Sequence, residues 1–125
     1  MNRGEFIEKY QCIVEKAVNS ADKALRQGLL ALEDELDHEK ADERDIFEYG
    51  LRFAVDGVDK ETIDRILSNI IKQEKDEQMC TLMNIQKEAV LGIRDDIGPR
   101  LLYALLNSLT DIKLNEDKMR KLFDE

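Results

Sequence analysis

The chain alternates between stretches in which apolar residues recur every three or four positions and short polar stretches. This spacing places side chains on one face of an α-helix, so each apolar stretch predicts an amphipathic helix. The first predicted helix runs from about Gly4 to Leu36. Its stripe consists of Phe6, Tyr10, Ile13, Ala17, Ala21, Ala24, Gly28, Leu32 and Leu36. Further aliphatic residues widen the stripe, which is typical of a helix with two neighbours.

A second helix is predicted after the polar stretch 37–43. Asp42 is the expected N-cap, because a carboxylate at that position accepts a hydrogen bond from a free backbone N–H of the first turn. Gly57 is expected to end the helix in a left-handed conformation. The apolar residues of this helix are Ile46, Phe47, Tyr49, Leu51, Phe53, Ala54 and Val55.

Two apolar stripes follow, over residues 63–71 and 79–93, and Asp59 is the expected cap of the first. On one continuous helix these stripes would lie about 180° apart. The chain therefore forms either one long helix with two faces or a turn near Glu74 to Gln78. No Gly or Pro lies between Gly57 and Gly92, so propensity favours one helix over about 59–95. A long helix would join a homodimer through this region, whereas a hairpin would give a compact monomer.

A short helix is predicted to begin with Pro99 at its first position, after Gly98. Asn115 is the expected cap of a last turn that contains Met119, Leu122 and Phe123. The β-branched clusters typical of strands are missing. The sequence therefore predicts an all-α fold of four to five helices, with one long central helix and no sheet, in a single domain over residues 1–125.

Composition excludes several classes of partner. The net charge is −9, from 28 acidic and 19 basic residues, which disfavours nucleic acid and anionic membranes. No apolar run approaches the roughly 20 residues of a membrane-spanning helix, and the N-terminus lacks the apolar segment of a signal peptide. Cys12 and Cys80 have no CxxC partner and are expected to be reduced thiols. A cytoplasmic protein without a membrane span is predicted.

No combination of residues predicts an active site. Glu35 and His38 form an ExxH motif, but a di-iron site needs two such motifs and the chain has one histidine. Nucleophilic catalysis needs a Ser or Cys activated by a base, but Cys12 and Cys80 lie in helical patterns and His38 is the only imidazole. The Asp56–Asp59 loop lacks the alternating oxygen ligands of a calcium site. We therefore expect no catalytic residue, no metal and no cofactor.

Three blocks of the chain occur in the order found in a known family. They are GLLALE at 28–33 with Glu35 following, YGLRFAVDGVD at 49–59, and the stretch from EAVLGI to GPRLL at 88–102. In this order they resemble the MotA family, the membrane-embedded stator subunits of the bacterial flagellar motor. The resemblance spans roughly residues 20–109. The four membrane helices of that family are absent, so the chain resembles the stator's cytoplasmic domain alone, without an ion pathway.

The resemblance implies residues that bind a partner. In the family, a charge pair on the first cytoplasmic segment is implicated in contact with the rotor switch protein. The acidic member falls on Glu33, and the basic member falls on Leu25. Arg26 lies next to it, about 100° further round a helix. With Lys23 and Asp34, these charged residues form the expected partner-binding set.

Two functions follow from these observations. The first is a non-catalytic protein-binding module that binds the rotor switch protein or the stator and modulates motility. The alternative is a self-assembling helical scaffold protein with no motor contact. Leu29, Leu30 and Leu32, which lie between the expected binding residues, are expected in the core in either case.

Overall fold

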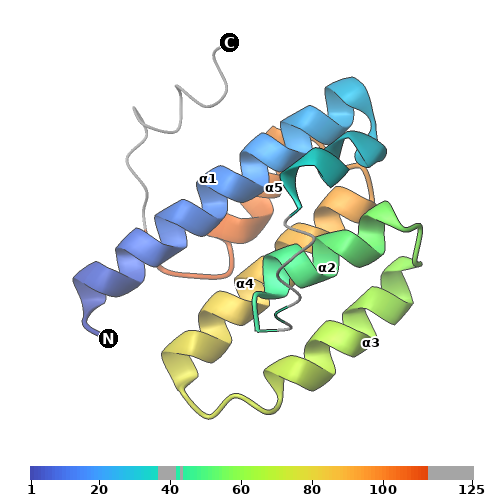
Figure 1. Ribbon diagram of the computed structural model, residues 1–125. Coiled ribbons are helices and arrows are strands. Elements are labelled where there is room, and N and C mark those ends of the chain that lie inside the picture. Colours follow the sequence, from blue (N-terminus) through green and yellow to red (C-terminus); the bar gives the residue numbers. More distant parts are fainter. Residues whose placement is uncertain (37–41, 43, 113–125) are drawn as a thin grey trace.

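The structure is a computed structural model that describes residues 1–36, 42 and 44–112, and its fold is all-α as predicted. The elements, in chain order, are α1 (Arg3–Gln27), the 3₁₀ helix η1 (Leu29–Glu35), α2 (Ile46–Val55), α3 (Lys60–Ile71), α4 (Glu77–Arg94) and α5 (Pro99–Asn107), as Figure 1 shows. No strand occurs among these residues. None of their helices combines the length and apolarity needed to cross a bilayer. His38 and the turn expected after Asn115 lie outside the described residues.

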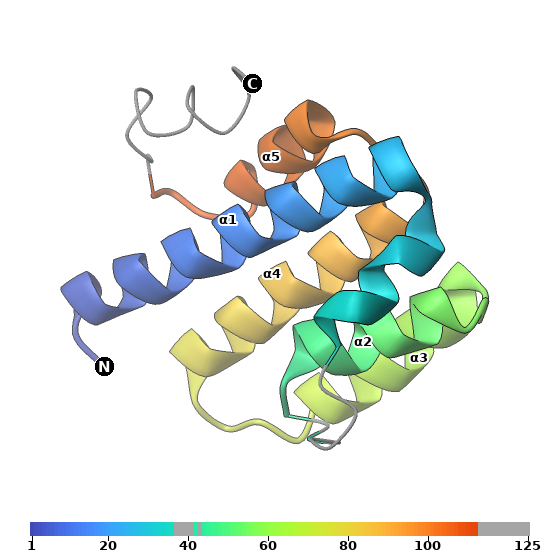
Figure 2. The ribbon, with the colours of Figure 1, turned by 45° about the horizontal axis from the view of Figure 1, so that its top comes forward.

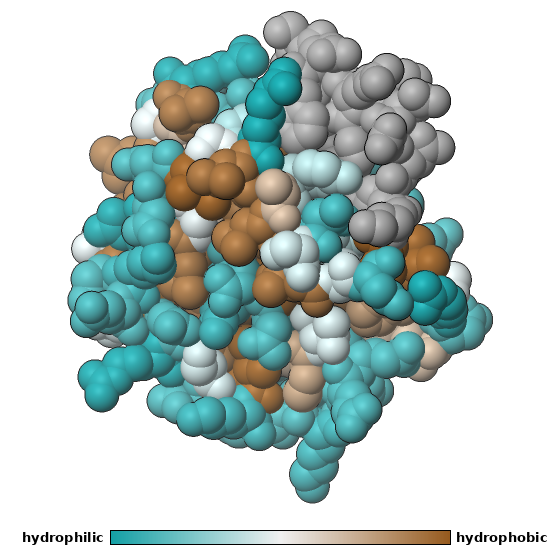
Figure 3. Space-filling model, turned by 180° about the vertical axis from the view of Figure 1, so that it is seen from behind, coloured by the Kyte–Doolittle hydropathy of each residue, from teal (hydrophilic) through white to brown (hydrophobic). Residues whose placement is uncertain are grey.

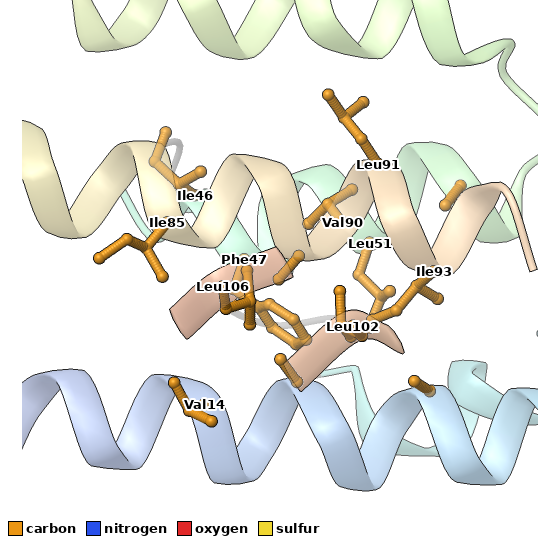
Figure 4. Close-up of a cluster of buried hydrophobic side chains, with 14 of the residues drawn as sticks. Val14, Ile46, Phe47, Leu51, Ile85, Val90, Leu91, Ile93, Leu102 and Leu106 are labelled. Carbon is orange, nitrogen blue, oxygen red and sulfur yellow. The ribbon is translucent and has the colours of Figure 1, made fainter. Parts of the chain in front are cut away.

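Helix α4 lies at the centre of the fold. It packs against α1 and α5 on one side and against α2 and α3 on the other (Figures 1 and 2). Residues 89–93 of α4 are all buried, so this part of the helix has no polar face. The side chains of α4 meet those of α1, α2 and α5 in one apolar cluster (Figure 4).

Helix α1 ends at Gln27, so the prediction of a helix from Gly4 to Leu36 is wrong in its last part. Gly28 has φ 93° and ψ 157°, a conformation that residues with a side chain rarely adopt. Its N–H donates to the carbonyl of Ala24 at 2.8 Å and closes the last turn. Gly28 fits the apolar stripe by spacing, but it acts as the C-terminal cap. The stripe itself is confirmed by burial of Tyr10, Val14, Ala17, Val18, Ala21 and Ala24.

The N-cap of α2 lies three residues later than expected. The Asp45 carboxylate accepts from the N–H of Glu48 at 3.2 Å and caps the helix. Asp42 instead accepts from the N–H of Arg44 at 2.9 Å, within the preceding turn, so the prediction of Asp42 as cap is wrong. The predicted stop at Gly57 is confirmed, with φ 83° at that residue.

Residues 59–95 form a hairpin, and the prediction of one long helix is wrong. Asp59 caps α3 as predicted, by accepting from the N–H of Thr62 at 3.2 Å. The chain turns after Ile71, and the Asp76 carboxylate caps α4 by accepting from the N–H groups of residues 78 and 79 at 2.9 and 3.2 Å. The turn brings both apolar stripes onto one core, so the offset between them no longer requires a second chain. The predicted homodimer through 59–95 loses its basis.

Polar contacts hold the two helices of this hairpin together. Lys87 Nζ lies 3.1 Å from Asp64 Oδ1 and donates to Ser68 Oγ at 3.3 Å. Arg94 Nε, at the end of α4, donates to the carbonyl of Val58, in the turn that precedes α3, at 2.8 Å. Partial burial of Asp64 disfavours its charge, but the hydrogen bonds from Lys87 and Ser68 outweigh this, and the pKa of Asp64 lies below its ordinary value.

Helix α5 packs along α1 and begins at Pro99, as predicted. Leu102 and Leu106 are fully buried. The Tyr10 hydroxyl of α1 donates to the carbonyl of Leu106 at 3.4 Å. Burial of the phenol, with a smaller contribution from Tyr103, raises the pKa of Tyr10 to about 12. The inner face of α5 is therefore fixed mainly by apolar packing.

Candidate protein-binding surface

The four residues expected to bind a partner lie on two adjoining elements. Lys23 and Arg26 belong to the last turns of α1, and Glu33 and Asp34 belong to η1. The turn at Gly28 folds η1 back against α1. The structure therefore gathers the predicted set at one end of the molecule, although α1 does not continue through it.

Two polar contacts fasten η1 to α1. Lys23 Nζ lies 3.6 Å from Glu35 Oε1, and Ser20 Oγ donates to Glu35 Oε2 at 3.3 Å. Leu32 anchors the same element, since it is fully buried among the core side chains. The surface of η1 is thus presented on an anchored element that also packs against α2.

The 3₁₀ geometry of η1 decides which of its leucines face solvent. With three residues per turn, side chains at i and i+3 lie on the same face. Leu29 and Leu32 therefore share the inner face, and Leu30 and Glu33 share another. Leu32 is 0 % exposed and Leu29 is half-buried, whereas Leu30 is 71 % exposed. The prediction that all three leucines lie in the core is confirmed for Leu32 and wrong for Leu30.

The charges around Leu30 differ in how they are paired. Arg26 Nε lies 3.1 Å from Asp22 Oδ1 on its own helix; the Arg26 side chain is well exposed and that of Asp22 is partly exposed. Exposed pairs of this kind contribute little to stability. Glu33 and Asp34 are exposed, and neither carboxylate forms an ion pair with another described residue. The surface thus presents an uncovered leucine with two acidic groups beside it.

The sequence predicted the charged residues of this surface, but it placed the exposed leucine, Leu30, in the core. A signal for it was present: Gly28 followed by leucines at 29 and 32 has the three-residue spacing of a 3₁₀ turn. That spacing separates Leu30 from the two leucines that face the core.

A surface pocket of about 450 Å³ lies between α1 and α4. Its lining residues are Glu5, Glu8, Lys9, Cys12, Ile13, Leu82 and Gln86. Both cysteines are free thiols, as predicted; Cys12 is exposed and Cys80 is half-buried. Within residues 1–36, 42 and 44–112, no group of three or more His, Cys, Asp or Glu side chains has the arrangement of a metal site.

Comparison of the chain with protein-family models, with curated proteins and with solved structures finds no match.

Proposed function

We propose that this chain is a cytoplasmic, non-catalytic protein-binding module whose binding surface is formed by η1 and the last turns of α1. The observation that carries the proposal is the exposure of Leu30, at 71 %, on the same face as Glu33. Leu32 anchors this face from below. An uncovered leucine on an anchored element gains favourable free energy when it is buried in an apolar pocket of a partner.

The two kinds of side chain on this surface have different roles in binding. Full burial of a leucine side chain contributes roughly 1.5–3 kcal/mol, so Leu30 is the proposed source of affinity. The exposed charges of Glu33, Asp34 and Arg26, with the partly buried Lys23, steer and orient the partner, and they affect the association rate and its salt dependence. Affinity and orientation thus come from neighbouring residues.

The proposed partner is a protein of the flagellar motor, either the rotor switch protein or the stator. The resemblance of residues 28–33, 49–59 and 88–102 to the MotA cytoplasmic domain supports this choice. Glu33 occupies the position of the family's acidic contact residue and is exposed. The module is proposed to modulate motility by occupying a contact surface, without conducting ions.

The test is direct binding of the purified chain to each purified motor protein, at low and moderate salt. Glu33→Lys and Leu30→Asp each alter the exposed face of η1. Glu8→Lys is the matched charge reversal, since Glu8 is exposed and lies 18 positions from Arg26 along α1, about 27 Å at 1.5 Å per residue. We expect at least a tenfold loss of affinity for the two η1 variants and little change for Glu8→Lys.

Two outcomes would overturn the proposal. If the motor proteins bind with equal affinity to all three variants, η1 is not the binding surface. If neither motor protein binds and the chain captures only itself, the alternative of a self-assembling scaffold protein replaces the motor function. Circular dichroism of each variant shows whether the helical fold is kept.

A further inference from the structure

Helix η1 has an unusual geometry for its sequence. It is a 3₁₀ helix of seven residues, whereas 3₁₀ runs longer than three or four residues are uncommon because their hydrogen bonds are poorer. Its sequence, LLALEDE, consists mainly of Leu, Ala and Glu, which are strong α-helix formers. The chain reverses at Gly28, which has φ 93°. Local sequence thus favours a continuous α-helix from α1 through η1, and the conformation of one glycine prevents it.

Four leucines would form one stripe on such a helix, which we call the leucine stripe: Leu25, Leu29, Leu32 and Leu36. They are spaced by four, three and four residues, so at 100° per residue they lie within about 60° of one another. This spacing is that of a coiled-coil seam.

The structure divides the leucine stripe at Gly28. Leu32 is buried, and Leu29 and Leu36 are half-buried against the core. Leu25, on the other side of the hinge, is 60 % exposed. Figure 3 shows hydrophobic surface toward the end of the molecule at which α1 ends. Leu25 is therefore the one member of the stripe that the folded-back η1 leaves uncovered.

A continuous helix over residues 3–36 does not fit well within one copy of the chain. Asp45, the N-cap of α2, lines the same surface pocket as Lys16 of α1. On a continuous helix, Leu36 would lie 20 positions beyond Lys16, or about 30 Å away. The connection from Leu36 to Asp45 spans at most roughly 32 Å. It would have to be almost fully extended, so a continuous helix favours release of α1 from its own bundle.

We propose that two copies of this chain exchange α1 around a twofold axis, with Gly28 as the hinge. In the exchanged dimer, residues 3–36 form one α-helix, and α1 of each copy packs against α4 and α5 of the other. The contacts that α1 makes within one copy are thereby repeated between copies. Exchange of an identical element in this way is a low-cost route to a dimer.

The leucine stripes of the two copies pair in antiparallel orientation. One register places Leu25 opposite Leu36 of the second copy, and the same register places Leu29 opposite Leu32 of the second copy. Each Leu36 then lies nine positions along the helix from Lys16 of the other copy, about 13.5 Å, which the connection to Asp45 spans easily. A single register thus satisfies both the stripe and the connection.

Exchange has a kinetic consequence. Helix α1 contributes fully buried side chains to the core, so it leaves its bundle only when the chain unfolds globally. We therefore expect dimers to form during refolding at high concentration and to persist after dilution. No motor protein is needed for exchange, so its failure leaves the proposed function untouched.

The first experiment is refolding of the full chain from urea at increasing concentration, followed by sedimentation velocity after dilution. We expect Leu25→Asp to lower the dimer association constant at least tenfold. Leu30→Asp is the matched control, since it places the same charge at an equally accessible leucine about 140° from Leu25 on a continuous helix, off the stripe. It should leave the dimer fraction unchanged.

The hinge is tested by Gly28→Ala. A side chain is strained at φ 93° but not within an α-helix, so this variant should raise the dimer association constant at least tenfold. Gly4→Ala is the control, because Gly4 lies within α1 in both states, and it should not change the dimer fraction.

Cross-linking distinguishes exchange from side-by-side association. Cys12 of α1 and Gln86 of α4 line one pocket, so a short bifunctional maleimide should join Cys12 to Gln86→Cys in a chain that also carries Cys80→Ser. In the exchanged dimer this link joins two copies and gives a dimer band on a denaturing gel. The same chain without Gln86→Cys should give none.

Three results would overturn this proposal. The first is that both the wild type and Gly28→Ala remain monomeric at the highest concentration reached. The second is a dimer that Leu25→Asp does not weaken. The third is a dimer whose maleimide links are all within single copies, which would mean that α1 stays on its own bundle.

Discussion

The α3–α4 hairpin and the α1–η1 hairpin both reverse the chain, but they differ in how many large apolar side chains they leave exposed. Among residues 44–94, which include α3 and α4, no large apolar side chain is exposed. All the exposed large apolar residues of the described chain lie in or beside α1, η1 and α5: Met1, Leu25, Leu30, Leu101 and Leu109. We therefore call residues 44–94 the closed half of the molecule, and α1, η1 and α5 the open half, because only the open half leaves large apolar side chains exposed.

Polar contacts that cross between elements occur in both halves, since Glu35 of η1 contacts Lys23 and Ser20 of α1. In the closed half, Lys87 joins α4 to Asp64 and Ser68 of α3, and its side chain is only 15 % exposed. In the open half, Arg26 is paired within its own helix and is well exposed. Contacts that cross between helices hold packing in place, whereas pairs on one helix do so only weakly. The two halves therefore differ mainly in their exposed apolar side chains, and the half that exposes them is the one available for binding.

The largest effect should come from the two neighbouring leucines of η1. Leu32→Ala should destabilise the fold by about 2–5 kcal/mol, because it opens a cavity in the core. Leu30→Ala should change the free energy of unfolding by less than about 0.5 kcal/mol, because that side chain already faces solvent. Urea denaturation of both variants measures the difference. Similar losses in the two variants would mean that Leu30 is buried in solution.

The turn between α1 and η1 should depend on Gly28. A side chain at φ 93° and ψ 157° is strained, so Gly28→Ala should cost about 1–3 kcal/mol. Gly4→Ala is the control, because Gly4 lies within α1 at ordinary helical geometry. There, alanine should stabilise by about 0.5–1 kcal/mol. If Gly28→Ala also stabilised the chain, α1 would continue past residue 28, as its apolar spacing had predicted.

Most of the fold could be predicted from periodicity and capping residues. The helix class, the stop at Gly57, the cap at Asp59 and the start at Pro99 each follow from local chemistry, and the structure confirms them. The sequence allows the turn at 72–76 as an alternative to the long helix, but the absence of Gly and Pro favours the long helix in spite of the opposite phases of the two stripes. Asp76, a good N-cap, was the local signal that favours a turn.

The candidate site could be predicted only in part. The resemblance assigned Glu33 and its charged neighbours, and the structure gathers these residues on α1 and η1. Leu30 is exposed because η1 is a 3₁₀ helix with three residues per turn. The apolar spacing predicted an α-helix here, with 3.6 residues per turn. The exposure of Leu101 on α5 depends on which neighbours a helix has, and leucine spacing alone does not reveal that.

The smallest effect should come from breaking one ion pair in each half. Asp64→Asn should cost about 0.5–1 kcal/mol at neutral pH, and Asp22→Asn should cost less, because only Asp64 joins two helices.

The pKa of Asp64 is lower in the folded chain than in the unfolded chain. Its contribution is therefore fully present above the unfolded pKa of about 4 and is lost as the pH falls through the folded value. The difference between wild type and Asp64→Asn should accordingly stay constant near neutral pH and shrink below pH of about 4. Urea denaturation at several pH values measures this. A difference that persisted in strong acid would mean that the Asp64 carboxylate does not stabilise the hairpin through its charge, and the contrast between the two halves would then rest on apolar packing alone.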